Sequence, residues 1–97
     1  MPTYIELINW TDQGIRNIKE APQRIDAFKK AVESAGGKVN GFYFTMGKYD
    51  IITIIEAPND DAIANIAIST GSKGSIRSET VKAFTEDQFR KIITKLQ

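Results

Sequence analysis

Residues 42–55 read FYFTMGKYDIITII, two strand-like runs joined by the turn GKYD at residues 47–50. The aromatic and β-branched side chains on both sides of the turn favour β-strands. Gly47 stands at the first central position of a two-residue turn, where a type II′ hairpin needs a residue that tolerates positive φ. The pattern therefore predicts a hairpin whose strands are residues 38–46 and 49–57.

The register of this hairpin determines which side chains share a face, because opposed residues on paired strands lie on the same side of a sheet. A two-residue turn places Thr45 opposite Asp50 and Tyr43 opposite Ile52. One face is then apolar enough to pack under helices: it holds Phe42, Phe44, Met46, Tyr49, Ile51 and Ile55. The other face is apolar along the strand and polar near the turn: it holds Val39, Tyr43, Thr45, Asp50, Ile52, Ile54 and Glu56. A single β-bulge would exchange the two faces.

Before the hairpin, the chain predicts a strand and then a helix. Residues 4–10 alternate as a strand with apolar groups on both faces: Ile5 and Leu7 lie on one face, and Tyr4, Glu6, Ile8 and Trp10 on the other. Residues 11–14 offer a cap for a short helical stretch, which Pro22 restarts at a first-turn position. Arg24 is expected on the solvated side of this first helix, and the glycines at 36–37 end it.

After the hairpin, Asn59 or Asp60 is expected to be the N-cap of a second helix. Residues 71–75, GSKGS, end that helix. Because they follow a helix and lack the spacing of a phosphate-binding loop, they predict a turn. Residues 76–84 alternate as a fourth strand with the polar content of a sheet edge. A capping box at residues 85–88 begins a last helix with one apolar stripe, formed by Phe89, Ile92, Ile93 and Leu96.

The order strand, helix, strand, strand, helix, strand, helix is that of a ferredoxin-like split βαβ sandwich with an added C-terminal helix. We therefore predict one α+β domain over residues 1–97, with a four-stranded antiparallel sheet whose central strands are the first and the third. Helices cover only one sheet face in this fold, yet both central strands carry apolar groups on both faces. A second copy covering the open face is the usual solution, so we predict a homodimer or a higher homo-oligomer. Scattered surface hydrophobes are the alternative.

The composition excludes several classes of function. Thirteen basic and twelve acidic residues give a net charge of +1, so no electrostatic footprint indicates binding to nucleic acid or to an anionic membrane. The chain has no Cys and no His, which excludes thiolate nucleophiles, Cys/His zinc sites and His-based acid–base chemistry. No metal or cofactor is expected. With no signal-peptide pattern and no apolar run of membrane-spanning length, the cytoplasm is the expected location.

Five side chains are candidates for a ligand site in the cavity between the sheets of two copies: Tyr43, Lys48, Asp50, Glu6 and Trp10. Asp50 either fixes the hairpin by accepting hydrogen bonds from the turn, or acts as a base or ligand anchor beside Tyr43. Tyr43 and Trp10 either pack in the core or contact a ligand. Lys48, at the tip of the turn, is either solvated or reaches a ligand. Glu6 is the alternative base.

Several consecutive blocks of the chain resemble the GYD domain family of small bacterial and archaeal proteins. The blocks are residues 4–7, 10–15, 22–24, 43–50, 56–60 and 74–84, and the resemblance extends over nearly the whole length. It implies a dimeric α+β barrel of ferredoxin-like protomers, and it brings no established substrate or catalytic set. Gly47, Tyr49 and Asp50 are also similar to a hairpin pattern in the effector-binding domains of leucine-responsive transcription regulators. Cofactor-free monooxygenases and muconolactone-type isomerases are similar in fold only.

Two functions are compatible with these residues. The first is a non-enzymatic oligomer that binds a small molecule or a partner in a cavity between two sheets, where Tyr43, Asp50 and Lys48 orient the ligand. The alternative is a small cofactor-independent enzyme of the isomerase, lyase or monooxygenase type. In that enzyme Asp50 or Glu6 would be the base, and Tyr43 would be the hydrogen-bond donor.

Overall fold

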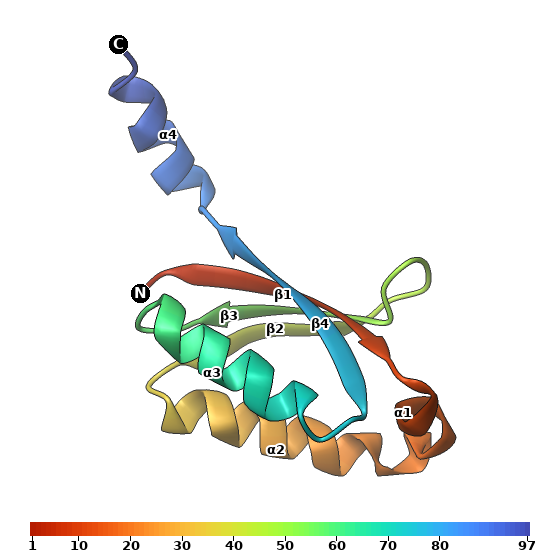
Figure 1. Ribbon diagram of the computed structural model, residues 1–97. Coiled ribbons are helices and arrows are strands. Elements are labelled where there is room, and N and C mark those ends of the chain that lie inside the picture. The colour runs from red at the N-terminus through yellow and green to blue at the C-terminus, as the bar shows by residue number, and fades with distance from the viewer.

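The two central strands of the sheet are β1 (Thr3–Trp10) and β3 (Ile51–Glu56), which pair antiparallel. β2 (Lys38–Phe44) flanks β3 and β4 (Ile76–Ala83) flanks β1, so the strand order is β2-β3-β1-β4. This computed structural model describes the whole chain, residues 1–97, and is shown in Figure 1. The strand order and the antiparallel pairing confirm the predicted α+β ferredoxin-like sheet, and the dimeric assembly stays a prediction.

The helices that follow β1 and β3 lie on one face of this sheet (Figure 1). α1 (Asp12–Arg16) and a short 3₁₀ turn (Ile18–Glu20) lead into α2 (Ala21–Ser34), which has Pro22 in its first turn as predicted. α3 (Asp60–Gly71) lies beside α2. Its predicted N-cap is Asn59, whose side-chain oxygen accepts a hydrogen bond from a backbone amide of the first turn. The other sheet face carries no helix.

The hydrophobic core fills the space between the sheet and helices α2 and α3. Each central strand contributes the residues of its helix-facing side, and each helix contributes the inward part of its surface. The fully buried members of this core are Tyr4, Val32, Ile55, Ala57, Ile63 and Ile66. The predicted alternation of β1 is confirmed, since Tyr4, Glu6 and Ile8 are all buried on this side.

Near its turn, the hairpin has the predicted register: Tyr43 pairs with Ile52 and Phe44 with Ile51. Both strands are shorter at the turn than predicted, and the connecting loop extends beyond the sheet (Figure 1). Phe44 is 64% exposed and Met46 is 92% exposed. The prediction that these two side chains pack under helices is wrong, because this end of the hairpin projects away from the helical layer.

A β-bulge at Asn40 shifts the register at the start of β2. Val39 pairs with Ile55, and the next paired residue, Gly41, faces Ile54. Because one residue is inserted, Val39 lies on the helix-covered side, where it packs against the core. Its predicted place on the uncovered face is therefore wrong. The bulge exchanges the faces only for the residues before it.

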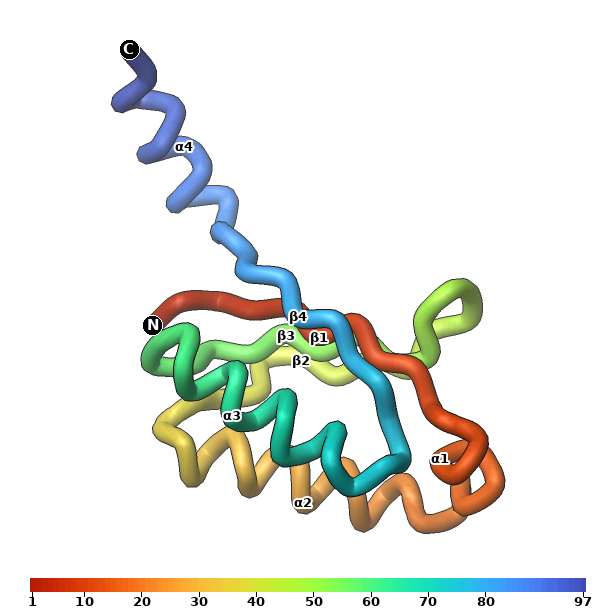
Figure 2. The backbone as a smooth tube through the Cα atoms, in the orientation of Figure 1, coloured from red at the N-terminus to blue at the C-terminus, as the bar shows by residue number.

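The last helix, α4 (Glu86–Thr94), follows β4 and projects away from the sheet and from the other helices (Figure 2). The predicted capping box is present, since Thr85 and Gln88 each bond the backbone amide of the other. The molecule is elongated as a result, with a longest extent of 52 Å. The predicted apolar stripe of α4 faces solvent along its whole length.

Candidate functional site

The sheet separates the five predicted site residues, because they do not all lie on the same side of it. Glu6 and Trp10 belong to the helix-facing side of β1. Tyr43 pairs with Ile52, and Ile52 in turn pairs with Leu7, so these three side chains lie on the opposite face. Glu6 and Tyr43 therefore do not line the same ligand site.

Glu6 is buried beneath the helices, with 2% of its surface exposed. Its Oε1 accepts a hydrogen bond from the Thr80 hydroxyl at 2.8 Å. Burial raises the pKa of the Glu6 carboxyl above its ordinary value of 4.5, and hydrogen bonds from Thr80 and Ser78 oppose this rise. The cross-strand neighbour of Glu6 on β3, Thr53, has a buried hydroxyl without a hydrogen-bond partner. Glu6 thus belongs to a polar row that runs from the buried Thr53 to the exposed Thr80 at the sheet edge, and Glu6 itself has almost no contact with solvent.

The raised pKa of Glu6 predicts how stability depends on pH. A folded-state pKa above the unfolded one means that the folded protein loses stability as pH rises through the folded-state pKa, since a buried carboxylate then forms. We expect Glu6→Gln to raise the free energy of unfolding near pH 7 by about 1 kcal/mol. Glutamine keeps an oxygen acceptor for Thr80. Urea unfolding from about pH 4 to pH 7 measures the effect.

The control for this prediction is Glu33→Gln, at an exposed carboxyl on α2. Its effect on stability should be small at every pH, because an exposed carboxylate keeps its hydration. The difference between Glu6→Gln and the wild-type protein should widen as pH rises. A difference that stays constant with pH would contradict the buried-carboxylate explanation.

Asp50 joins the hairpin to β1. Its Oδ2 accepts a hydrogen bond from the backbone N–H of Trp10 at 3.0 Å, and its own backbone N–H donates to the Ile8 carbonyl at 2.9 Å. The hydroxyl of Thr45 bonds within the turn, where it donates to the Tyr49 carbonyl at 2.6 Å. The acceptor role expected for Asp50 is therefore present, but the donor belongs to the neighbouring strand instead of the turn.

Trp10 and Lys48 both make aromatic contacts at the hairpin end of the protein. Trp10 stacks on Phe44, with ring centroids 5.9 Å apart and an interplanar angle of 25°. The Nζ of Lys48 lies 5.6 Å from the centroid of the Tyr49 ring, within the range of a cation–π contact. The Trp10–Phe44 stacking and the hydrogen bonds of Asp50 hold the hairpin against the end of β1, whereas the Lys48 contact stays within the hairpin loop.

The uncovered side of the sheet is apolar at its centre. We call it the open sheet face and define it by Ile5, Leu7, Tyr43, Ile52, Ile54 and Val81, which strand pairing places side by side. Tyr43 is 57% exposed and Val81 is 40% exposed. On β4, Arg77 and Glu79 lie on the same side at the sheet edge. An apolar centre with a charged edge is the composition of a protein interface.

The segment around α1 is fastened to the start of β4. We call this contact the α1–β4 corner and define it by Thr11, Gly14, Gly74 and Ser75. The Thr11 hydroxyl donates to the Gly74 carbonyl at 2.5 Å, and the Thr11 backbone N–H donates to the Ser75 carbonyl at 3.1 Å. A Cβ atom on Gly14 would lie 2.0 Å from the Ser75 carbonyl oxygen. The close approach of the two backbones therefore requires glycine at position 14.

Arg24 supports the same corner from α2. Its guanidinium donates to the carbonyls of Asn17 at 3.1 Å and Gly14 at 3.3 Å, and it lies 3.8 Å from the Glu20 carboxylate. The side chain is 28% exposed, so its expected position on the solvated side of the helix is wrong. The physical reason is that the last carbonyls of α1 have no partner within the helix and need a donor.

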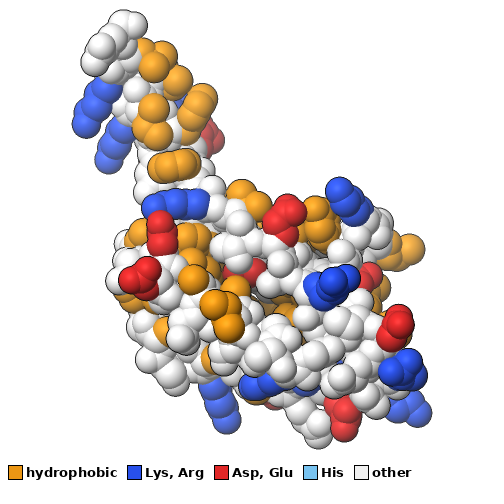
Figure 3. All heavy atoms as spheres, viewed as in Figure 1, with side chains coloured by type: hydrophobic (Ala, Val, Ile, Leu, Met, Phe, Trp, Pro, Cys, Tyr) orange, Lys and Arg blue, Asp and Glu red, His pale blue; other side chains and the backbone are white.

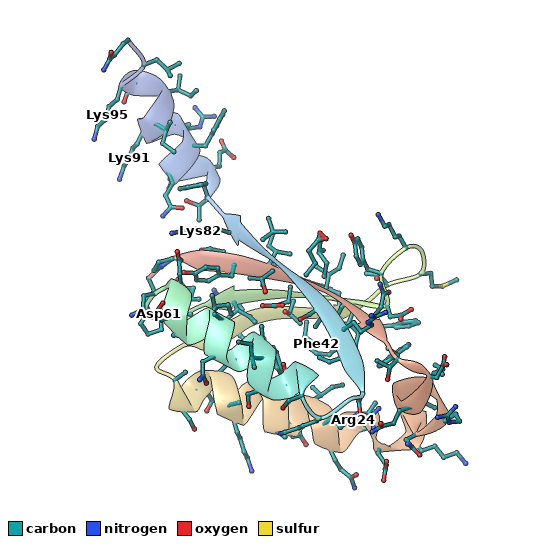
Figure 4. The ribbon with its side chains drawn as sticks, viewed as in Figure 1. Arg24, Phe42, Asp61, Lys82, Lys91 and Lys95 are labelled. Carbon is teal, nitrogen blue, oxygen red and sulfur yellow. The ribbon has the colours of Figure 1, made fainter.

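Tyr4, Asp60 and Lys82 form a polar cluster that the sequence did not predict. The Tyr4 hydroxyl donates to Asp60 Oδ1, and the Nζ of Lys82 lies 3.2 Å from the same oxygen. The pKa of Tyr4 is raised to about 12. The hydrogen bond to the Asp60 carboxylate is the larger cause, and burial is the second. Hydrogen bonds from Tyr4 and Lys82 lower the pKa of Asp60. Lys82 lies close to the first turn of α3 in Figure 4, so the cluster ties that helix to the sheet.

Comparison with known proteins gives consistent results. The model of the GYD domain matches residues 4–93. A Thermus thermophilus protein named "Glutamine synthetase and cystathionine beta-lyase binding protein" is 31% identical over 84 residues, which cover 86% of this chain and 88% of that protein. The crystal structure of TTHA0845 from Thermus thermophilus is similar in fold, with a TM-score of 0.55 and 21% identity over 88% of this chain and 95% of that one.

Two further observations bear on the kind of site. No group of three or more potential metal-ligating side chains gathers in one place. Every helix is too short or too polar to cross a bilayer. The open sheet face is half-buried at its centre and exposed at Tyr43 and Val81, and the stripe of α4 is exposed.

Proposed function

Because this chain belongs to the GYD domain family, we propose that it is a homodimeric cytoplasmic protein that binds another protein through α4. The open sheet face binds the second copy, and α4 remains available for a different partner. The name of the Thermus relative, which describes binding to glutamine synthetase and cystathionine beta-lyase, supports a metabolic enzyme as that partner.

The observation that carries this proposal is the apolar stripe of α4. Its four members follow the spacing i, i+3, i+4 and i+7 that a helix uses when it docks in a groove. They are Phe89, Ile92 and Ile93 within the helix and Leu96 two residues beyond its end, with exposed fractions of 57%, 46%, 46% and 70%. Figure 3 shows hydrophobic side chains along one side of the projecting helix and Lys and Arg side chains along the other.

The remaining features of α4 suit docking as well. The capping box at its start and the ion pair of Arg90 with Glu86, at 2.8 Å, favour a helix before the partner arrives. Lys91 and Lys95 lie together on another side of the helix (Figure 4). A short isolated helix is only marginally stable in water, so burial of the stripe against a partner would stabilise it.

The geometry favours binding over catalysis. An enzyme of the kind considered above would need Glu6 or Asp50 beside Tyr43. The sheet separates Glu6 from Tyr43, and the Asp50 carboxylate accepts a hydrogen bond from the backbone of Trp10. These contacts support a structural role for both carboxylates.

The test measures binding of the full chain to immobilised glutamine synthetase and cystathionine beta-lyase from the same organism. We expect Ile92→Asp to weaken binding by about tenfold or more, since a fully buried aliphatic side chain contributes about 1.5–3 kcal/mol. The matched control is Lys91→Asp, which places the same side chain at the neighbouring position outside the stripe. Its effect should stay within about threefold, as is usual for residues at the edge of an interface.

Three outcomes would overturn the proposal. If neither enzyme binds the wild-type protein, the proposed class of partner is wrong. If Ile92→Asp binds as well as the wild type, α4 is not the docking helix. If Ile92→Asp instead changes the oligomeric state measured by sedimentation, the stripe belongs to the assembly of identical copies. Circular dichroism shows whether each variant remains folded.

A further inference from the structure

A cavity of about 110 Å³ lies between the sheet and the helices, on the side away from the open sheet face. Nine of its thirteen lining residues are hydrophobic. Ile8 and Trp10 line it from β1, Ile51 lines it from β3, and Phe28 and Ile25 line it from α2. Phe42 lines it from β2, on the helix side of the sheet (Figure 4). This site is therefore separate from both protein-binding surfaces.

We propose that this cavity binds a small organic anion with an apolar body, such as an aromatic or branched aliphatic carboxylate. The volume requires a small apolar body, because the cavity is smaller than the apolar cavity of about 150 Å³ in a protein interior that is known to hold benzene. Aromatic and aliphatic walls would surround the body, and the charged group would lie at the solvent side.

The four lining residues that are not hydrophobic determine the charge of the ligand. They are Arg24, Thr70, Lys73 and Ser75, so two cations and no carboxylate line the cavity. Lys73 is exposed and takes part in none of the ion pairs of the protein. Arg24 is held in place by two carbonyls and is partly neutralised by Glu20, and its guanidinium has further donors.

Ser75 adds a hydrogen-bonding group to the cavity wall. The residue is 8% exposed and lines the cavity. Its backbone carbonyl accepts a hydrogen bond from the Thr11 backbone N–H in the α1–β4 corner, so the backbone that carries the side chain is held beside the cavity. The Ser75 hydroxyl is a hydrogen-bond donor. A carboxylate oxygen would accept from it.

The experiment titrates the full chain with benzoate and with benzamide, its neutral analogue of nearly equal size. Trp10 is the one tryptophan in the chain and lines the cavity, so its fluorescence reports occupancy. We expect saturable binding of benzoate with a dissociation constant of about 1 mM, as small ligands of this size allow. Benzamide should bind at least about tenfold more weakly, because it carries no charge.

Three variants locate the site. Lys73→Met should weaken benzoate binding by about threefold or more and leave benzamide unchanged, since it removes only a cation. The matched control, Lys30→Met, removes an exposed cation on α2 that does not line the cavity and should change neither ligand. Ile25→Phe adds bulk inside the cavity and should abolish binding of both, and thermal unfolding shows whether it is folded.

Equal binding of benzoate and benzamide would overturn the assignment of an anion. Unchanged fluorescence with both ligands would overturn the site itself. Equal effects of Lys73→Met and Lys30→Met would mean that benzoate responds to net charge and not to this cavity. Because Lys73 is exposed, its variant gives a decisive result even if Ile25→Phe fails to fold.

Discussion

Gly14→Ala is expected to destabilise the protein by about 3 kcal/mol or more. The added Cβ would lie 2.0 Å from the Ser75 carbonyl oxygen and 3.0 Å from the carbonyl carbon, both of which are backbone atoms. These atoms cannot move aside freely, because Thr11 bonds the backbone of both Gly74 and Ser75. Overpacking in a rigid site costs about 1–3 kcal/mol and sometimes more. Alanine gains about 1 kcal/mol of helix propensity over glycine, which is too little to offset the clash.

The matched control is Gly71→Ala. Gly71 also lies in a helix, at the end of α3, and nothing lies within 4 Å of an added Cβ. This variant should be neutral or more stable by up to about 1 kcal/mol, because only the helix propensity changes. Urea unfolding compares the two midpoints. If both glycine variants were equally stable, the α1–β4 corner would not be rigid, and its role in positioning Ser75 at the cavity would be contradicted.

The sequence predicted those parts of the fold that local patterns encode. Alternation along β1 predicted which side chains are buried, and the turn chemistry predicted the pairing of Tyr43 with Ile52. The capping residues at Asn59 and Thr85 predicted where two helices begin. Each of these signals lies within a few residues of its consequence, so a single sequence is enough to detect it.

Features that depend on distant contacts were not predicted. The bulge that moves Val39 to the core was not predicted, although strands disfavour Asn40 and Gly41 and a glycine inside a strand often marks a bulge. Arg24 contacts carbonyls of the preceding helix, and only the packing of α1 against α2 brings them together. The Tyr4 and Asp60 pair spans 56 positions in the chain.

The candidate site was predicted least well. Its residues were expected around one ligand, but they lie on both sides of the sheet. Spacing correctly placed Glu6 and Trp10 on one side of β1, but it gave no information on whether that side holds an empty cavity. The cavity arises where the side chains of β1, β2 and α2 fail to fill the layer. Such a packing deficit is a property of the three-dimensional arrangement, and no residue encodes it alone.

Ile52→Lys is expected to convert the proposed homodimer into a monomer. Ile52 lies at the centre of the open sheet face, where it pairs with both Leu7 and Tyr43. In a symmetric dimer the same patch occurs on both subunits, so one substitution places two ammonium groups in one apolar interface. Burial of both charges without partners should cost about 4 kcal/mol in total, which raises the dimer dissociation constant about a thousandfold. Sedimentation at about 10 μM should then show a large shift from dimer towards monomer.

The control is Ile68→Lys, the same substitution at a side chain that is 72% exposed on α3, on the helical side of the protein. It should leave the dimer intact. In an isolated subunit, lysine on the open sheet face would gain hydration and would not weaken the fold. The two variants therefore show whether the open sheet face is an interface or a set of scattered surface hydrophobic residues. A wild-type protein that sediments as a monomer, or an Ile52→Lys variant that remains dimeric, would contradict the assignment of this face to the second copy.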